Sequence, residues 1–188
     1  MIAALLLLLQ SATTSGSADA LARLQAQVPV EIVAQPSPSR LAGHYTSTSA
    51  EVRKKIGGFL SGEDLYLFSD GTYIYTEWTD IFPLTIEDSG TWRIARGCVS
   101  LRSSPAITWQ TTHERTFLAV RRPAREGEAI LVGLGDSLKH IEQFGWHDPE
   151  FSLLAAGLVR EEAFDPAAGR QIKKKLMADA WRPERHGK

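Results

Sequence analysis

Apolar and polar side chains alternate with the period of a β-strand on both sides of Asp70-Gly71. The flanking segments, 65–68 and 72–78, are rich in aromatic and β-branched residues, which favour strands. An Asp-Gly dipeptide supplies the positive φ values that a two-residue hairpin turn requires. The pattern therefore predicts a β-hairpin with Asp70-Gly71 as its loop, and this is the strongest local signal in the chain.

The predicted register gives this hairpin two unlike faces, because side chains alternate and antiparallel partners lie opposite each other. One face is mainly aliphatic: Leu65, Leu67, Ile74, Thr76 and Trp78. The other is aromatic: Tyr66, Phe68, Tyr73 and Tyr75. We expect the aliphatic face to join the core. The aromatic tier is either covered by a helix or forms the wall of a ligand-binding cavity for an apolar or sugar-like molecule.

A second hairpin is predicted over residues 90–102, with Arg96-Gly97 as its turn. Trp92 then lies opposite Leu101 on an apolar face, and a slip of one residue would expose that face to water. Further segments have strand-like patterns: 41–45, with Tyr45 directed inward, 116–121 and 128–134. Short strands with tight connections predict an antiparallel meander.

The hydrophobic period changes in the last third of the chain. Helix starts are predicted at Asp136 or Ser137, at Asp148 and at Asp165. Residues 158–164 fit either a helix or, after a break at Gly157, a strand. The predicted fold is thus mainly β: an antiparallel meander forming a small barrel or a strongly bent sheet, with two or three C-terminal helices packed on it.

The N-terminus has the pattern of an export signal. Residues 2–9 are apolar and Ala18-Asp19-Ala20 is typical of a signal-peptidase site, so residues 1–20 are predicted to be removed. The apolar run is shorter than the roughly 20 residues that span a bilayer. Residues 10–30 contain no cysteine that could carry a lipid anchor. We expect a periplasmic or secreted protein that is not lipid-anchored.

Proline and serine at positions 35–39 predict a linker. Residues 21–40 are therefore interpreted as an N-terminal segment and linker, and residues 41–188 as a single β-meander domain with C-terminal helices. The formal net charge of -1 and the sequence pI of about 6.5 argue against a nucleic-acid-binding protein. Cys98 is the single cysteine, so neither an intramolecular disulfide nor a cysteine-ligated metal is expected.

Three short motifs carry a family resemblance: Gly43-x-Tyr45, Asp70-Gly71-Thr72-Tyr73 and Gly90-Thr91-Trp92. In this order they resemble the lipocalin-like β-meander domains of uncharacterised exported bacterial proteins, over residues 41–102. Lipocalins themselves carry Trp where this chain has Tyr45. The resemblance implies a closed barrel with an internal cavity, and it implies fold more than activity.

Candidate catalytic groups are sparse. Histidine and carboxylate adjoin at His113-Glu114 and His147-Asp148, but their spacing fixes no metal or general-base geometry, so no metal and no cofactor are expected. Asp80, Glu87 and Asp88 flank an apolar loop predicted at 79–89, and paired carboxylates can hydrolyse glycosides. No nucleophile elbow or phosphate-binding loop is present in the sequence.

The last predicted helix has an apolar stripe, Ile172, Leu176 and Ala180, beside a basic group, Arg170, Lys173, Lys174, Lys175 and Arg182. The stripe can cover the sheet, and the basic group can contact an anionic membrane surface. The leading hypothesis is an exported, non-enzymatic binding or envelope-accessory module for a small ligand. The alternatives are a hydrolase that uses the carboxylates near 79–89, and an interaction protein that presents the basic helix.

Overall fold

The computed structural model describes residues 22, 25–33, 36–82, 84–95, 98–104, 115–123, 125, 128–135 and 149–179. The strands are β1 (Glu31–Ile32), β2 (Gly43–Thr46), β3 (Ser61–Leu67), β4 (Thr72–Thr79), β5 (Thr85–Ala95), β6 (Cys98–Ser103), β7 (Thr116–Arg121), β8 (Ile130–Gly133) and β9 (Leu158–Ala163). The helices are α3 (Pro38–Leu41), α4 (Ala50–Ile56), α6 (Pro149–Ala156) and α7 (Pro166–Asp179). The predicted export signal, residues 1–20, lies outside the described ranges.

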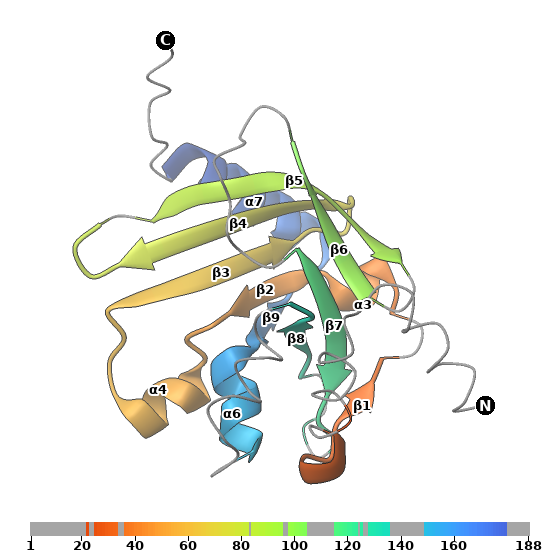
Figure 1. The fold of residues 1–188 in the computed structure, drawn as a ribbon. Helices are drawn as coiled ribbons and strands as arrows, with labels where there is room; N and C mark the ends of the chain where they lie inside the picture. The colour runs from red at the N-terminus through yellow and green to blue at the C-terminus, as the bar shows by residue number, and fades with distance from the viewer. Residues whose placement is uncertain are drawn as a thin grey trace.

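Strands β2 to β9 close into an antiparallel barrel (Figure 1). Each strand pairs with the next one along the chain, and β9 pairs back with β2, so the meander forms a ring of eight strands. Closure leaves the ring without exposed strand edges. The predicted fold class, a mainly β antiparallel barrel with C-terminal helices packed on it, is confirmed.

The central hairpin differs from its predicted register by one residue. Phe68 N–H donates to the Thr72 carbonyl at 2.9 Å, and Gly71 N–H donates to the Phe68 carbonyl at 3.0 Å. The loop is therefore Ser69-Asp70-Gly71, with Gly71 at a φ of 80°. A type I turn followed by a residue in the left-handed region is the usual three-residue hairpin loop, and it needs glycine only at its last position.

This shift redistributes the predicted aromatic tier. Leu67 lies opposite Tyr73 and Leu65 opposite Tyr75, so both tyrosines share the inward face with the leucines. Tyr66 pairs with Ile74, on the outer surface of the barrel. The prediction that the four aromatic residues share one face is wrong, because Ser69 belongs to the loop.

The second hairpin has the predicted register. Trp92 pairs with Leu101, and Ile94 pairs with Val99, while the turn residues 96–97 lie outside the described ranges. Trp92 is 5% exposed, and its indole N–H donates to the Phe68 carbonyl at 2.9 Å. This bond fixes the second hairpin to the turn of the first.

The barrel interior is one of three hydrophobic clusters. Its members include Tyr45, Leu65, Leu67, Tyr73, Tyr75, Trp92, Val99, Leu101, Phe117, Ala119, Leu131 and Leu158. At one end, α3 places Leu41 against this cluster, and the Tyr45 hydroxyl donates to the Leu41 carbonyl at 2.8 Å. Burial raises the pKa of Tyr45 to about 12, against a smaller opposing effect of Arg160, so its hydroxyl stays a donor.

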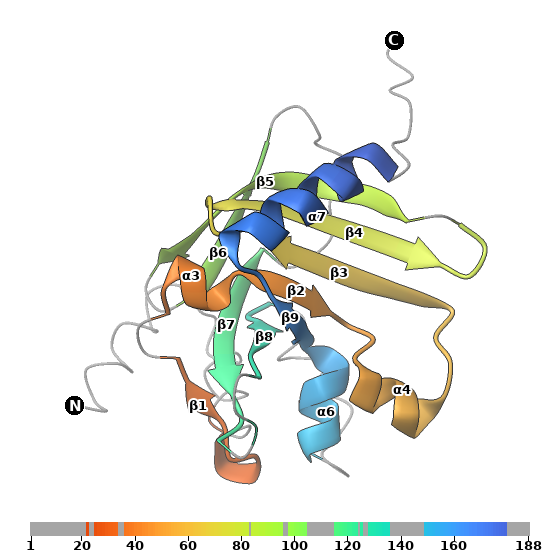
Figure 2. The ribbon, with the colours of Figure 1, turned by 180° about the vertical axis from the view of Figure 1, so that it is seen from behind.

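The second cluster lies outside β3, β4 and β5, where α7 crosses the sheet (Figure 2). It joins Phe68, Ile74, Ile86, Phe164 and Leu176, with Tyr66 and Ile172 packed against it. The Asp165 carboxylate caps the helix by accepting from the backbone N–H groups of Ala167 and Ala168 at 2.7 and 2.8 Å. The predicted start of the final helix and its role as a cover are confirmed.

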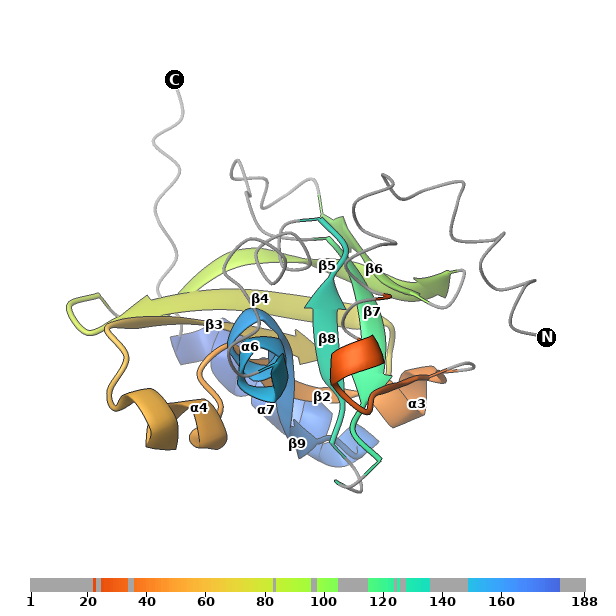
Figure 3. The same ribbon diagram turned by 60° about the horizontal axis from the view of Figure 1, so that its bottom comes forward.

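The third cluster lies outside β6 to β9 and packs under α6, with Leu153 and Leu154 inward and Cys98 buried at 6% exposure. Helices α4 and α6 lie beside each other at one end of the molecule (Figure 3). Residues 158–164 were predicted to form either a helix or a strand, and they form the strand β9 up to Ala163. The strand is favoured because its backbone groups pair with β2, a partner that the sequence of the segment alone does not reveal. The helix predicted after Asp136 lies outside the described residues.

Two predicted boundaries move. Val28 is 2% exposed, and β1 pairs with the end of β7. Residues that precede the predicted domain start near residue 41 are therefore packed against the domain.

The predicted loop at 79–89 is shorter, because β5 already begins at Thr85 and pairs with β4. The register shift between Tyr75 and Thr76 bulges β5 and turns Asp88 inward.

Candidate functional site

A cavity of about 410 Å³ opens at the end of the barrel opposite α3, where β2 and β4 end and β3 and β9 begin. Its lining comes from both sides of the barrel: Ser47, Thr48, Phe59, Ser61, Gly62, Glu63, Tyr75, Glu77, Trp78, Thr79, Phe117, Leu131, Ala155, Ala156, Gly157 and Leu158. The volume lies within the range of small-molecule sites. The barrel interior below this cavity is filled by side chains.

Tyr75 lies where the cavity meets the packed interior, with 1% of its surface exposed. Its pKa is raised first by burial, then by the charge of Glu63 and an interaction between its hydroxyl and that carboxylate, and further by the charge of Glu77. The tyrosine is therefore protonated at neutral pH, and its hydroxyl can donate a hydrogen bond.

Glu63 and Glu77 lie directly opposite each other on β3 and β4. They continue the inward-facing rows of Leu65 and Tyr75, since side chains two apart on a strand share a face. Both are exposed and both line the cavity, so their carboxylates meet solvent through its opening. The open end of the barrel thus holds two acidic groups above the Tyr75 hydroxyl.

The opposite wall of the cavity is apolar. Phe117, Leu131 and Leu158 line it and are 3%, 0% and 6% exposed. These residues come from β7, β8 and β9, the last three strands of the barrel. Strand β9 closes the barrel by pairing with β2. A molecule in this cavity meets carboxylates on one side and hydrocarbon on the other.

Gly62 permits a close approach at the edge of the cavity. A Cβ at this position would lie 2.6 Å from the Trp78 ring and 2.8 Å from the Thr48 methyl group. Any larger residue would displace the indole, which rests across β3. Trp78 is half-exposed, so part of this ring borders solvent.

Apolar side chains also project beside the opening. Leu60, Ile81 and Phe82 are 74%, 76% and 65% exposed. The Asp80 N–H donates to the Leu60 carbonyl at 2.8 Å, which holds the α4–β3 and β4–β5 connections together. Leu60 adjoins the lining residues Phe59 and Ser61, so the exposed group borders the cavity.

The structure brings one of the four predicted ligand-binding residues to this cavity, namely Tyr75. Tyr73 is inside the barrel, where its hydroxyl donates to Asp88 at 2.5 Å. Tyr66 and Phe68 lie outside, and the rings of both stack on Phe164, with centroids 6.5 and 6.0 Å apart. For these two residues, the helix-covered alternative is the one found.

The carboxylates of the predicted hydrolase site have unlike surroundings. Asp88 is 0% exposed and accepts from the Ser103 hydroxyl at 2.6 Å in addition to Tyr73. Asp80 is exposed at the start of the β4–β5 connection, and Glu87 occupies the bulge of β5. None of the three lines the cavity.

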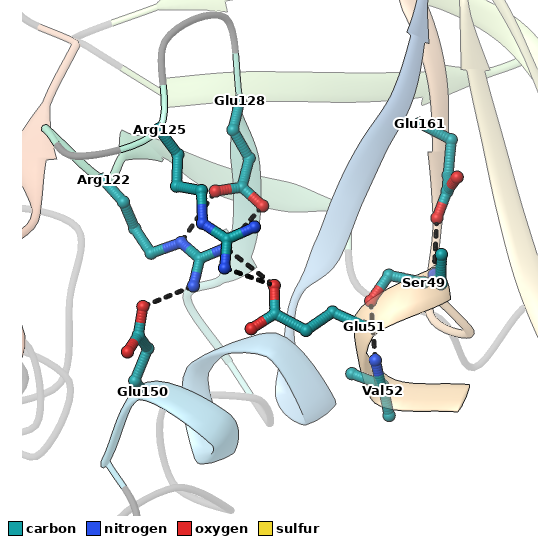
Figure 4. A network of polar contacts seen from close by, with 9 residues as sticks. Ser49, Glu51, Val52, Arg122, Arg125, Glu128, Glu150 and Glu161 are labelled. Carbon is teal, nitrogen blue, oxygen red and sulfur yellow. Dashed lines mark hydrogen bonds and ion pairs between the residues drawn. The ribbon is translucent and has the colours of Figure 1, made fainter. Parts of the chain in front are cut away.

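A buried arginine joins helices α4 and α6 (Figure 4). The Arg122 side chain is 2% exposed and pairs with Glu128 at 2.7 Å, Glu51 at 3.1 Å and Glu150. Burial lowers its pKa, but hydrogen bonds to the three carboxylates and the charge of Glu128 outweigh burial, so the net shift is upward. Because Glu51 lies on α4 and Glu150 on α6, this network fixes both helices to β7 and β8.

The basic face of α7 is partly engaged. Lys173 donates to the Asp70 carboxylate at 3.0 Å and to the Thr72 hydroxyl at 2.7 Å, and it lies 5.5 Å from the Phe68 ring centroid. Lys174 and Lys175 are exposed, while Ala180 and Arg182 lie outside the described residues. The apolar stripe of this helix is packed on the barrel.

Metal-binding groups do not gather in the part of the chain that the structure describes: no three His, Cys, Asp or Glu side chains there could hold an ion. His113, His140 and His147 fall outside that part. None of the described helices is long and apolar enough to cross a membrane.

Comparisons with protein-family models, curated protein sequences and solved structures found no match to this chain. The cavity therefore has to be interpreted from its own residues.

The sequence analysis did not identify Glu63 and Glu77 as cavity residues, because the two-residue turn placed Thr76 opposite Leu65. With Ser69 in the loop, the inward rows extend to both glutamates, and this alternation is the signal that could have found them.

Proposed function

We propose that this protein is an exported, non-enzymatic binding module that holds a small ligand in the cavity at the open end of its barrel. The cavity of about 410 Å³ carries this proposal, because it combines an apolar wall with a few convergent polar groups. Such sites occur at the mouths of barrels. The lipocalin-like resemblance and the export signal stay predictions that agree with this role.

The surroundings of the cavity support a binding site over a packing defect. Arg122 fixes α4 and α6 beside the barrel end, and residues of α6 line the opening. At the other end, α3 and Leu41 close the barrel. One end is thus filled, and α6, which borders the cavity at the other end, is anchored by a buried ion network.

The test is a titration with N-phenyl-1-naphthylamine, a neutral apolar dye whose fluorescence rises in apolar surroundings. We expect saturable binding at one site per chain. Ala155→Phe places a large ring at a lining position of α6, and it should weaken dye binding at least tenfold.

Ala167→Phe is the matched control, because Ala167 is exposed near the start of α7 and does not line the cavity. This variant should bind the dye as the unchanged protein does. Equal binding by both variants, or no saturable binding at all, would contradict the proposed site. Export is tested separately: mass spectrometry of the protein from the producing cell should find cleavage after Ala20, and retained Met1 would contradict it.

A further inference from the structure

We infer that the ligand of this cavity is an uncharged glycoside, a sugar ring joined to a hydrocarbon group. This inference rests on the proposed binding function and names the chemical class of the ligand. It follows from three features of the lining: the order of apolar and polar pairs along β3 and β4, the anchored hydroxyl groups at the opening, and the apolar wall across from them.

The inward-facing pairs of β3 and β4 change in character from the packed interior to the opening. From the interior outward, they are Leu65 with Tyr75, Glu63 with Glu77, and Ser61 with Thr79. The last two pairs line the cavity. One side of the cavity therefore presents two successive rows of oxygen atoms, carboxylates first and hydroxyls beyond them.

Two hydroxyl groups at the opening are held in place by backbone hydrogen bonds. Ser47 Oγ accepts from the N–H of Glu63 at 2.9 Å, and Thr79 Oγ1 accepts from the N–H of Phe82 at 2.9 Å. A hydroxyl that accepts one bond keeps its own O–H as a donor. Ser47 follows β2 and Thr79 ends β4, the two strands that flank β3, and both residues line the cavity. The opening thus has positioned donors on both sides of β3.

The polar groups of the lining match a ligand that both donates and accepts hydrogen bonds. The carboxylates of Glu63 and Glu77 are acceptors, and the hydroxyls of Ser47 and Thr79 can donate. An ammonium group would give those hydroxyls nothing to donate to. An anionic head group would be repelled by the carboxylates, whatever further contacts these make within the protein. Uncharged hydroxyl groups, as on a sugar ring, satisfy both kinds of partner.

The remaining lining suits a sugar ring that carries a hydrocarbon group. Phe59 and the half-exposed Trp78 add aromatic rings to the lining, and the weakly positive C–H groups of a sugar pack against the negative face of such a ring. Phe117, Leu131 and Leu158 form the apolar wall. A sugar alone would leave this wall without an apolar partner, whereas a glycoside with a hydrocarbon group covers it.

The experiment compares molecules that share one hydrocarbon chain and differ in the head group: octyl β-glucoside, octanol and octanoate, each below its aggregation concentration. Each is titrated against the protein with N-phenyl-1-naphthylamine bound. Octyl β-glucoside should displace the dye at a concentration about tenfold below that of octanol, because its sugar ring adds hydrogen bonds. Octanoate should be the weakest competitor.

Ser47→Ala combined with Thr79→Val removes both anchored hydroxyls with little change in size. In this variant, octyl β-glucoside and octanol should displace the dye at concentrations within about threefold of each other, and octanol should compete as it does in the unchanged protein. Ser39→Ala combined with Ser69→Ala is the control, since both serines are exposed and neither lines the cavity. It should keep the preference for the glucoside.

Thermal melts should show that both variants are folded. If the Ser47 and Thr79 double variant is not folded, the two single variants replace it, and each should lower the preference for the glucoside about threefold.

The outcomes separate the two claims. A preference for octyl β-glucoside that is lost only when Ser47 and Thr79 are changed supports the inference. If the unchanged protein binds the dye but the glucoside competes no better than octanol, or if the preference persists without the two hydroxyls, the cavity binds ligands and the inference about the sugar ring is wrong. If neither dye nor octyl compound binds at the cavity, the proposed function is wrong as well.

Discussion

Glu63 on β3 and Glu77 on β4 form a directly opposed pair at the inner edge of the barrel opening, two positions along from Leu65 and Tyr75. Farther into the barrel, both strands carry buried apolar or aromatic side chains on this face. Leucine and tyrosine side chains thus fill the barrel as far as Leu65 and Tyr75, and the next inward position on each strand carries a carboxylate. The cavity begins at that point.

Arg122 should be far more important for stability than its neighbour Arg125. Arg122→Ala leaves Glu128, Glu51 and Glu150 without their buried cation. Breaking a buried ion pair lowers the free energy of unfolding by about 3–5 kcal/mol. Arg125 is 54% exposed and pairs with Glu51 at 3.3 Å, so Arg125→Ala should cost at most about 1 kcal/mol. Similar losses in urea melts of the two variants would contradict the role assigned to the network.

The hairpin turn can be tested through its glycine. Gly71 has a φ of 80°, a conformation that costs other residues about 1–2 kcal/mol, so Gly71→Ala should destabilise by that amount. Gly58→Ala is the control, because a Cβ there meets nothing within 4 Å and no left-handed φ is required. It should be neutral or stabilising by up to about 1 kcal/mol. Equal effects of the two substitutions would argue against the three-residue loop.

The contact between Asp70 and Lys173 should make stability depend on pH. Partial burial raises the pKa of Asp70, but hydrogen bonds from Thr72 and Lys173 outweigh burial and lower it overall. A lowered folded-state pKa stabilises above the unfolded value of about 3.9, and this contribution disappears as pH falls through the folded-state pKa. Because Asp70 is 53% exposed, we expect less than about 1 kcal/mol at pH 7.

Asp70→Asn and Lys173→Met should therefore each lower stability slightly at pH 7. For Asp70→Asn, the difference should vanish in acid, where the original carboxylate is protonated as well. Lys174→Met is the control, since Lys174 is exposed on the same helix. A loss from Asp70→Asn that is as large in acid as at pH 7 would show that the carboxylate charge is not responsible.

The pattern of apolar and polar residues predicted an element correctly where only one arrangement of that element agrees with the pattern. Trp92 and Leu101 could be paired from sequence, because any other register would expose an apolar face. Asp70-Gly71 was ambiguous, because a two-residue turn and a type I turn with a left-handed glycine both accept it. Residues 158–164 were undecided because their strand depends on β2, more than a hundred residues earlier in the chain.

The site was less predictable than the fold for a related reason. A cavity arises where side chains from distant strands stop filling the barrel, and Phe117, Leu131 and Leu158 reach it only through closure. The bulge at Glu87, which turns Asp88 inward, has no local marker in the sequence. One shifted residue in the first hairpin was then enough to group Tyr66 and Phe68, which pack in the cluster under α7, on one face with Tyr73 and Tyr75.

A crystal structure of the protein with bound N-phenyl-1-naphthylamine tests the central claim most directly. We predict one dye molecule in the cavity, with its rings against Phe117 and Leu131. An empty cavity at saturating dye, or dye bound elsewhere on the surface, would contradict the account.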